Sequence, residues 1–370
     1  MSTPTKRVLL INLGGPRDAS EIEKFLLDLF TDPYVFDLPL PEFLRIRLAR
    51  FIARRRAPKV AHTYAEMGFG GGSPLLAETE KQAQALAATL HTRTGENWQV
   101  DVTMTCGYPD IRELPADRLA PTPDNIILPL YPQYSRSTVL STAMIMKSIL
   151  GYCPAARPGW VTPFFNDDEY CAAIADLIVR FFQGRLADGD FIQFTGPGPI
   201  PDWQRITLVF SAHGIPMRLI HKGDVYVEQV ERNRRLIEKH LRSRGFQGET
   251  RLSFQSRVGP ARWTEPNTID MLQHLGNAGH ERVAVYPISF VSDHLETLEE
   301  IAMQLREVAF ENGIQVYYRI PAPGTFAPFI DYLADRVIAA ARHAYPAGVC
   351  LCSQMGGHQP DARANPECIR

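Results

Sequence analysis

At 370 residues the chain is longer than one ordinary domain, and it predicts two, since domains of about 100–200 residues are the most common. Its composition, 45% hydrophobic and 22% charged residues, is that of a globular protein. The net charge of −2 provides no overall positive field, so we expect no nucleic-acid partner.

The N-terminal segment leads directly into an apolar run and lacks the apolar core of a secretion signal. No stretch of the sequence reaches the roughly 18 apolar residues of a membrane-spanning helix. We therefore expect a cytoplasmic protein.

Apolar β-type runs alternate with helix-type periodicity along the chain. Strands are predicted over residues 8–13, 98–104, 125–130, 206–210, 251–254, 283–290 and 314–320. Helices are predicted between them, over residues 77–93, 168–182, 225–244, 267–275 and 295–308. Such alternation is typical of parallel sheets covered by helices.

The predicted fold is therefore α/β, with two doubly wound domains. The first covers residues 1–160 and the second residues 161–325, with the Pro- and Gly-rich stretch 151–163 as the crossing between them. A terminal helix (326–345) and a cysteine-containing tail (346–370) follow.

Two glycine-rich turns lie in the first half, at residues 12–16 and 68–75. Neither completes a phosphate-binding motif, so a nucleotide-dependent enzyme is disfavoured. Close approach of the backbone to a flat ligand explains both clusters better.

Residues 41–56 show an amphipathic helix pattern in which arginines alternate with Phe, Leu and Ile. One interpretation is an ordinary surface helix. The other is an apolar lip flanked by cations, suited to a hydrophobic dianion or to an anionic membrane surface.

Aromatic and polar side chains follow two predicted strands. Tyr134 and Arg136 lie after the strand at 125–130, and Trp263 lies in the loop after the strand at 251–254. Separately each segment is a loop, but together they predict a cleft with aromatic walls and polar anchors.

His213 follows the predicted strand at 206–210, and Gly214 and Pro216 prevent a simple continuation of that strand. A neutral imidazole is the side chain best suited to accept a proton at cellular pH. The alternative is a loop histidine whose nitrogens bind backbone groups.

Three carboxylates follow another predicted strand. Asp293, Glu296 and Glu300 are spaced i, i+3 and i+7, which places them on one face of a predicted helix. Oxygen ligands at a strand end suit a divalent cation in transit, and they also suit the outward passage of protons. A solvated outer face is the alternative.

The chain resembles the ferrochelatase family in motifs that occur in order. They are Leu-Ile-Asn-Leu-Gly-Gly-Pro at 10–16, Gly-Gly-Gly-Ser-Pro-Leu at 70–75, Tyr-Pro-Gln-Tyr-Ser at 131–135, Phe-Ser-Ala-His-Gly-Ile-Pro at 210–216, Gln-Ser-Arg-Val-Gly-Pro at 255–260 and Ser-Asp-His-Leu-Glu-Thr-Leu-Glu-Glu at 292–300. The resemblance implies two Rossmann-like, chelatase-type domains that enclose a porphyrin cleft. It also implies insertion of Fe²⁺, as substrate, into protoporphyrin IX with release of two protons, the terminal step of haem synthesis.

The resemblance assigns roles to individual residues. His213 and Glu296 are implied as catalytic and metal-site residues, with Asp293 and Glu300 for iron delivery or proton exit. Which of His213 and Glu296 takes the proton and which contacts iron is left open. The residues implied to contact the porphyrin are Leu13, Tyr134 and Phe290 against the ring, Arg136 at a propionate, and Trp263. Contact of the apolar lip with the inner membrane is a further expectation.

The sequence departs from the family pattern in two places. Where the family usually reads Met-Arg-Tyr-Gly-x-Pro, residues 104–109 read Met-Thr-Cys-Gly-Tyr-Pro, with Tyr108 as a candidate replacement. The tail cysteines Cys350, Cys352 and Cys368 resemble the ligands of the [2Fe-2S] cluster of some family members, but with a wider last spacing. Four thiolates are needed, and the predicted fourth is Cys171, with Cys153 as the alternative. A tail with free thiols is the other interpretation.

The sequence is also compatible with other functions. One is a ferrochelatase that acts on coproporphyrin III, and another is a cobalt or nickel chelatase for an earlier tetrapyrrole. A haem-binding protein without turnover is a further alternative, but it would have no need for the row of carboxylates.

Overall fold

The computed structural model describes residues 6–36, 40–66, 68–187 and 189–342. Contacts divide the chain into two compact units, which we describe separately. The first contains the residues up to 163 together with those from 333 onward, and the second contains residues 164–332.

The first unit contains a parallel sheet in the order β2-β1-β3. Its strands are β1 (Lys6–Asn12), β2 (Trp98–Met104) and β3 (Asn125–Pro129). The central strand β1 buries a continuous apolar run, Val8 to Ile11. Such a run is typical of a parallel strand covered on both faces, which is why the sequence revealed it.

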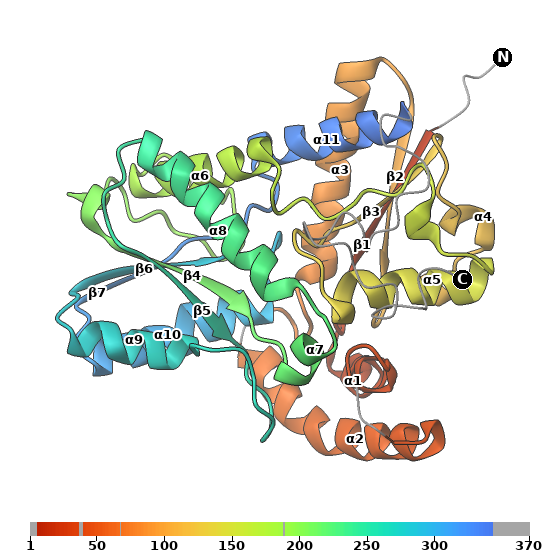
Figure 1. The fold of residues 1–370 in the computed structure, drawn as a ribbon, viewed down its shortest axis with the longest axis horizontal. Helices are drawn as coiled ribbons and strands as arrows, with labels where there is room; N and C mark the ends of the chain where they lie inside the picture. Colours follow the sequence, from red (N-terminus) through yellow and green to blue (C-terminus); the bar gives the residue numbers. More distant parts are fainter. Residues whose placement is uncertain (1–5, 37–39, 67, 188, 343–370) are drawn as a thin grey trace. The chain divides into compact units, whose positions relative to one another are not determined.

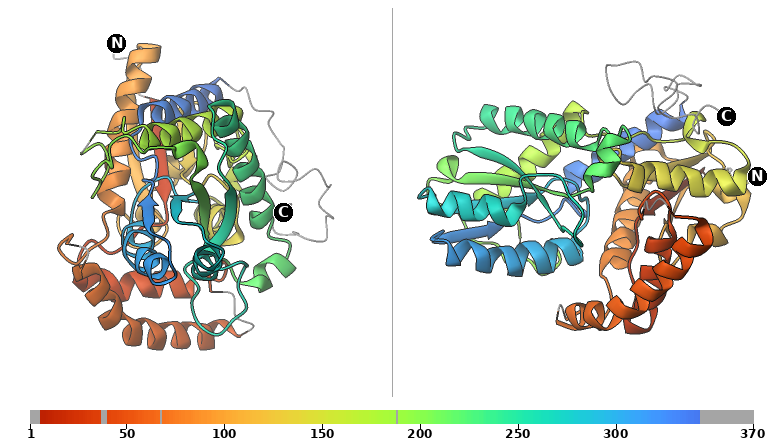
Figure 2. Two further views of the ribbon diagram at one scale, coloured as in Figure 1. Left: turned by 90° about the vertical axis from the view of Figure 1, so that its left-hand side faces the viewer. Right: turned by 60° about the horizontal axis from the view of Figure 1, so that its bottom comes forward.

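Helices surround this sheet, as Figure 1 shows: α1 (Ile22–Thr31), α2 (Glu42–Glu66), α3 (Leu75–Thr94), α4 (Ala116–Leu119) and α5 (Ser141–Leu150). Between them lie three short 3₁₀ helices, η1 (Ala19–Glu21), η2 (Ile111–Glu113) and η4 (Pro154–Ala156), and one short π-helix, η3 (Arg136–Leu140). Helices α1 and α2 lie side by side (Figure 2). Helix α2 is longer than predicted, because it continues through Pro58.

The second unit contains a parallel sheet in the order β5-β4-β6-β7. Its strands are β4 (Thr207–His213), β5 (Thr250–Gln255), β6 (Arg282–Pro287) and β7 (Val316–Arg319). All strands predicted from the sequence are present in the two sheets, and the predicted α/β fold with two parallel sheets is confirmed.

Helices cover both faces of the second sheet (Figure 1). Helices α6 (Asp168–Phe182) and α8 (Tyr226–Ser243) lie on one face, and α9 (Thr268–Asn277) and α10 (Leu305–Glu311) lie on the other. A core of Val209, Val285, Leu272 and Leu305 joins the sheet to α9 and α10. The remaining elements are η5 (Trp203–Arg205), α7 (Met217–His221), η6 (Glu296–Gln304) and α11 (Ala327–Ala341).

The glycine-rich turns bring backbone segments of the first unit together. A Cβ atom on Gly14, whose φ is +98°, would lie 1.9 Å from the Cys106 carbonyl oxygen. A Cβ atom on Gly72 would lie 2.0 Å from the Arg17 carbonyl oxygen. The close approach predicted at these glycines therefore involves the protein's own backbone.

None of the helices in the described ranges is long and apolar enough to cross a membrane.

Candidate functional site

His213 is the last residue of β4, so the strand extends beyond the predicted end at Phe210. The neighbouring parallel strand β6 ends at Pro287, and the segment that carries Glu296 follows it. Since the carboxyl ends of parallel strands lie at the same edge of a sheet, β4 and β6 bring His213 and Glu296 to one edge. This edge of the second sheet is the candidate site.

The ring of His213 has a defined tautomer. Its Nδ1 lies 2.6 Å from the Gly214 carbonyl oxygen, which can only accept a hydrogen bond. The hydrogen of a neutral ring must therefore sit on Nδ1, and the lone pair must sit on Nε2. Phe290 and Trp263 flank this ring, at centroid distances of 6.2 and 6.5 Å. An imidazole held this way can accept a proton at Nε2.

His294 forms an ion pair with Glu296. Its Nε2 lies 3.0 Å from Glu296 Oε2, and its Nδ1 lies 2.9 Å from the Ser292 carbonyl oxygen. Both partners only accept hydrogen bonds, so both ring nitrogens must carry hydrogens and the ring is an imidazolium. The ring of Phe290 packs edge-on against His294, with centroids 4.7 Å apart.

The two charges of this pair shift each other's pKa. Burial alone would lower the pKa of His294, but the Glu296 carboxylate outweighs it and raises that pKa. Burial alone would raise the pKa of Glu296, but the charge and hydrogen bond of His294, with a smaller contribution from His213 when that ring is protonated, lower it to about 2. Glu296 is therefore ionised at neutral pH, and its side chain is still 25% exposed.

Asp293 lies before the helix rather than in it. Its carboxylate is buried and forms an ion pair with Arg319, at 3.0 Å from Nη1 to Oδ2. The backbone N–H of Ala322 also donates to its Oδ1, at 3.3 Å. Asp293 therefore links the residues after β6 to the end of β7.

Glu300 binds the loop that follows β5. Its carboxylate accepts from the backbone N–H of Ser256 at 2.7 Å, from the Ser256 hydroxyl, and from Gln255 Nε2 at 3.1 Å. The helix that carries it, η6, is a π-helix, whose turns are wider than those of the predicted α-helix. The predicted α-helical face shared by Asp293, Glu296 and Glu300 is not formed.

The predicted metal-site residues thus have different surroundings. Glu296 lies at the same sheet edge as His213 and pairs with His294, whereas Asp293 and Glu300 each bind other groups. In the described ranges, no three His, Cys, Asp or Glu side chains converge as a metal-binding group. Sequence reasoning missed His294, although it lies within the Ser-Asp-His-Leu-Glu motif.

The first unit holds the other residues predicted to contact a porphyrin. Leu13 follows β1 and is half-buried, and its carbonyl accepts from Cys106 N at 2.8 Å and from the Thr105 hydroxyl at 3.2 Å. Tyr134 is buried, and Arg136 is half-buried at the start of η3. Leu13 and Tyr134 follow neighbouring strands of one sheet, β1 and β3.

Comparison with known proteins decides the family. The family model described as ferrochelatase matches residues 5–341, nearly the whole chain. The chain belongs to the ferrochelatase family. Members of this family are metal chelatases of haem biosynthesis, and the resemblance predicted from the sequence is confirmed.

Several ferrochelatases align with this chain over most of its length. The protein from Leptospira borgpetersenii serovar Hardjo-bovis (strain JB197) is 56% identical and covers 98% of both chains. That from Leptospira biflexa serovar Patoc (strain Patoc 1 / Ames) is 50% identical, over 96% of this chain and 97% of the relative. The chloroplastic ferrochelatase-2 of Hordeum vulgare is 38% identical, over 90% of this chain and 66% of the relative.

A solved structure from Deinococcus radiodurans, described as similar to chelatases, matches with a TM-score of 0.49 and 13% identity. The match covers 92% of this chain and 56% of that one.

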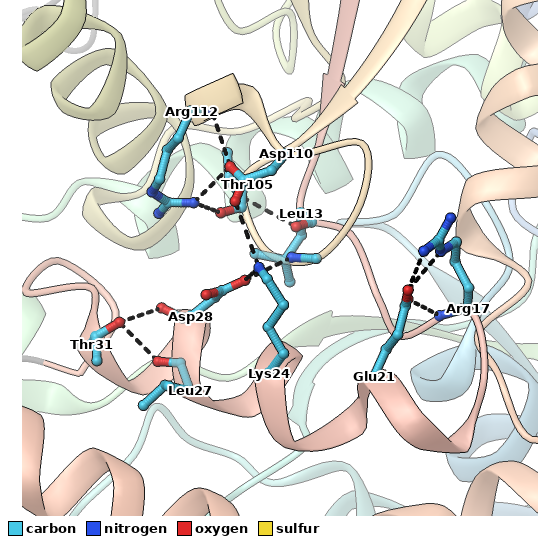
Figure 3. A network of polar contacts seen from close by, with 11 residues as sticks. Leu13, Arg17, Glu21, Lys24, Leu27, Asp28, Thr31, Thr105, Asp110 and Arg112 are labelled. Carbon is cyan, nitrogen blue, oxygen red and sulfur yellow. Dashed lines mark hydrogen bonds and ion pairs between the residues drawn. The ribbon is translucent and has the colours of Figure 1, made fainter. Parts of the chain in front are cut away.

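The segment that departs from the ferrochelatase pattern is tied to α1 (Figure 3). Lys24 lies 2.7 Å from Asp28 and 3.6 Å from Asp110, and Asp28 accepts from Gly107 N at 3.2 Å. Arg112 donates to the Thr105 carbonyl at 2.8 Å and to Asp110 at 3.1 Å.

Residues 104–109, where the sequence differs from the family pattern, have a structural role in the first unit. Thr105 uses its hydroxyl to bind the Leu13 carbonyl, and Cys106 is buried. The candidate replacement Tyr108 is exposed, and the Arg17 guanidinium lies 4.2 Å from its ring centroid. Threonine and cysteine here help to fix the loop that carries Leu13, where the family commonly has arginine and tyrosine.

The ion pair at Glu296 makes stability depend on pH in two directions. Because the pKa of Glu296 is lowered to about 2 in the folded state, its contribution is present above the ordinary Glu value of about 4.3 and is lost as the pH falls toward 2. Because the pKa of His294 is raised, its contribution is present below the ordinary His value of about 6.5 and is lost as the pH rises through the raised value.

Replacing Glu296 by glutamine is expected to lower the pKa of His294. Burial would still oppose protonation of the ring, while the carboxylate that outweighs burial would be gone. NMR titration of the histidine Cε1–H signals measures this shift, with His294→Gln identifying the signal. An unchanged pKa would show that Glu296 does not pair with His294.

Proposed function

We propose that this ferrochelatase inserts Fe²⁺ into protoporphyrin IX, with release of two protons, and that His213 and Glu296 carry the reaction. The observation that supports this most is the combination at one sheet edge. An imidazole that is bound through Nδ1 to the Gly214 carbonyl, and so offers Nε2 for a proton, shares this edge with a carboxylate that an imidazolium keeps ionised.

The two groups suit different parts of the reaction. A porphyrin must lose two pyrrole protons, and Fe²⁺ must exchange water for nitrogen ligands. His213 Nε2 has the lone pair of a base and is our candidate for the proton acceptor. Glu296, with its pKa lowered to about 2, is a weak base but a permanent anion, so it suits attraction of the incoming Fe²⁺.

The carboxylates of Asp293 and Glu300 have supporting roles in this proposal. Asp293 is neutralised by Arg319, and Glu300 is held by Ser256 and Gln255. Both therefore position the segment around Glu296 instead of meeting the metal first. The proposed porphyrin contacts remain Phe290 and Trp263 beside His213, with Leu13, Tyr134 and Arg136 in the first unit.

An anaerobic assay with purified protein tests this function. We expect Fe²⁺ insertion into protoporphyrin IX, with a lower kcat/KM for coproporphyrin III. Faster metallation of coproporphyrin III would overturn the proposed substrate. Cobalt insertion into sirohydrochlorin alone, or haem binding without turnover, would overturn the proposed reaction.

We also propose that α2 contacts an anionic lipid surface. Phe43 and Phe51, eight positions apart on one stripe of the helix, are 62% and 60% exposed. The exposed arginines Arg47 and Arg50 lie beside them. Large exposed apolar side chains beside cations are typical of helices that lie in a membrane interface.

Replacing Phe43 and Phe51 by serine is expected to weaken vesicle binding about tenfold or more, since burying one Phe side chain stabilises by about 1.5–3 kcal/mol. Cosedimentation with phosphatidylglycerol vesicles measures this. The control is Phe310→Ser, which removes a phenylalanine of α10 that is 44% exposed. Equal binding of the double variant and the wild type would contradict the proposal.

The predicted [2Fe-2S] cluster stays a prediction. Cys350, Cys352 and Cys368 lie outside the described residues. Cys171 is buried in α6, donates to the Phe165 carbonyl at 3.5 Å and accepts from Asn233 Nδ2 at 3.4 Å, and burial raises its pKa to about 12. A cluster ligand is a thiolate, so Cys171 as placed here does not fit that role. Cys153 is half-buried.

A further inference from the structure

Gln255, the last residue of β5, contacts both β4, which carries His213, and η6, which carries Glu296. The residue is 1% exposed, and its Nε2 donates to the Glu296 carbonyl at 2.7 Å and to Glu300 Oε2 at 3.1 Å. On the other side, its Oε1 accepts from the Ser211 hydroxyl at 2.7 Å. One buried amide thus joins β4 to the first turn of η6.

The orientation of this amide is determined by its partners. A carbonyl and a carboxylate only accept hydrogen bonds, so the NH₂ group must face Glu296 and Glu300. The amide oxygen must then face Ser211, whose single hydroxyl hydrogen points to it. A rotated amide would place its oxygen against two acceptors in a buried site, which is costly.

Ser211 is itself held in place. Its hydroxyl lies 3.0 Å from that of Thr268, which contacts the Ser253 hydroxyl at 3.0 Å. All three side chains are buried. The Gln255 amide is therefore connected to a series of hydroxyl groups from β4, α9 and β5.

The backbone of Gln255 also reaches the His213 side of the site. Gly214 N donates to the Gln255 carbonyl at 2.8 Å, and the Gly214 carbonyl accepts from His213 Nδ1 at 2.6 Å. The same residue therefore fixes the peptide that orients His213 and the helix turn that carries Glu296.

We propose that Gln255 is a positioning residue for iron insertion. It holds the Glu296 carbonyl and the Glu300 carboxylate in one geometry, and this sets the direction of the Glu296 side chain relative to His213. This inference rests on the proposed function of Glu296 and His213. In this proposal Gln255 contacts neither iron nor porphyrin and acts through Glu296 and His213, which do.

Two substitutions of similar length test this role. Gln255→Glu replaces the NH₂ donor by an acceptor and so places a negative charge against Glu300. Gln255→Met removes both polar groups and adds no charge. For each, we expect kcat for iron insertion to fall about 10- to 100-fold, as is typical when a partner that orients a metal-site ligand is lost. The KM for the porphyrin should stay unchanged, because Gln255 does not contact it.

Asn233→Asp is the matched control. Asn233 is also a buried amide of the second unit, and it donates to the Phe165 carbonyl at 2.6 Å in the packing around α8. This change should lower stability and leave kcat of the folded protein unchanged. If Asn233→Asp lowers kcat as much as Gln255→Met does, general destabilisation explains the loss and the inference is overturned.

Deuterium uptake by peptides covering residues 292–308 gives a readout that does not need activity. Uptake there should rise in Gln255→Met and stay at the wild-type level in Asn233→Asp. Wild-type kcat or wild-type uptake in a folded Gln255→Met protein would overturn the inference.

If the wild type inserts no iron and uptake still rises in Gln255→Met, the proposed function fails while the structural role of Gln255 stands. If Gln255→Met does not fold, Gln255→Glu, whose ionised carboxylate cannot donate to the Glu296 carbonyl, must give the same rise in uptake, and wild-type uptake in that variant would overturn the inference.

Discussion

Replacing Glu296 by glutamine is expected to lower kcat for iron insertion about 100- to 1,000-fold while the fold stays intact. The substitution keeps the size of the side chain and removes its charge. Losses of this size are typical when one preorganised electrostatic group is removed from an active site. The half-buried position of Glu296 at the start of η6, where its side chain pairs with His294, allows the neutral amide to be accommodated.

The structural reason for this effect is the ion pair with His294. The imidazolium keeps Glu296 ionised down to about pH 2, so the carboxylate presents a negative charge at every cellular pH. Glutamine cannot supply this charge, and the buried imidazolium would lose its partner. We therefore expect both the attraction of Fe²⁺ and the protonation state of His294 to change.

Glu299→Gln is the control for this experiment. Glu299 lies on the same helix, is half-buried, and is contacted by Gln304 Nε2 along the helix. The same chemical change at this position should leave kcat within about twofold of the wild type, as expected for a surface substitution. Circular dichroism and thermal unfolding establish that both variants fold. Near-normal turnover of Glu296→Gln would contradict its assignment.

The fold could be predicted because buried parallel strands have a simple sequence signature. Strand β2 was predicted with the bounds it has, and helix α6 likewise, because apolar runs and helical periodicity report which residues face a core. Helix α2 was predicted too short, since a proline normally ends a helix and Pro58 does not.

The candidate site was only partly predictable. Sequence motifs indicated His213 and Glu296, because polar residues after apolar strands collect at one sheet edge. The partners of the carboxylates were not predictable, since Arg319 lies in β7 and Ser256 in the loop after β5, and periodicity carries no information on contacts between distant segments. The π-helix was missed because its apolar pattern is close to that of an α-helix.

His294 shows where further information was available. It lies in the same motif as Asp293 and Glu296, and a histidine two residues before a glutamate could have been considered as its partner. The tautomer of His213 could not have been predicted from the sequence, because it depends on the Gly214 carbonyl and hence on the turn after β4. The proposed division of roles between His213 and Glu296 depends on that tautomer.

Replacing His213 by alanine is expected to lower kcat about 100- to 10,000-fold, the range typical for loss of a general base. The ring occupies the end of β4 with Nδ1–H bound to the Gly214 carbonyl, so Nε2 is the nitrogen that can take a pyrrole proton. Alanine offers no acceptor there. Because His213 is half-buried and is the last residue of its strand, we expect the variant to fold.

The lower kcat of His213→Ala should respond to an added base. Added imidazole should restore part of the rate, since the space left between Phe290 and Trp263 suits a small aromatic base. His221→Ala, which removes an exposed histidine from α7, is the control and should keep wild-type turnover. A base role predicts rescue of His213→Ala but no rescue of Glu296→Gln, because imidazole cannot replace a negative charge. Rescue of both, or near-normal turnover of His213→Ala, would show that the proton acceptor lies elsewhere.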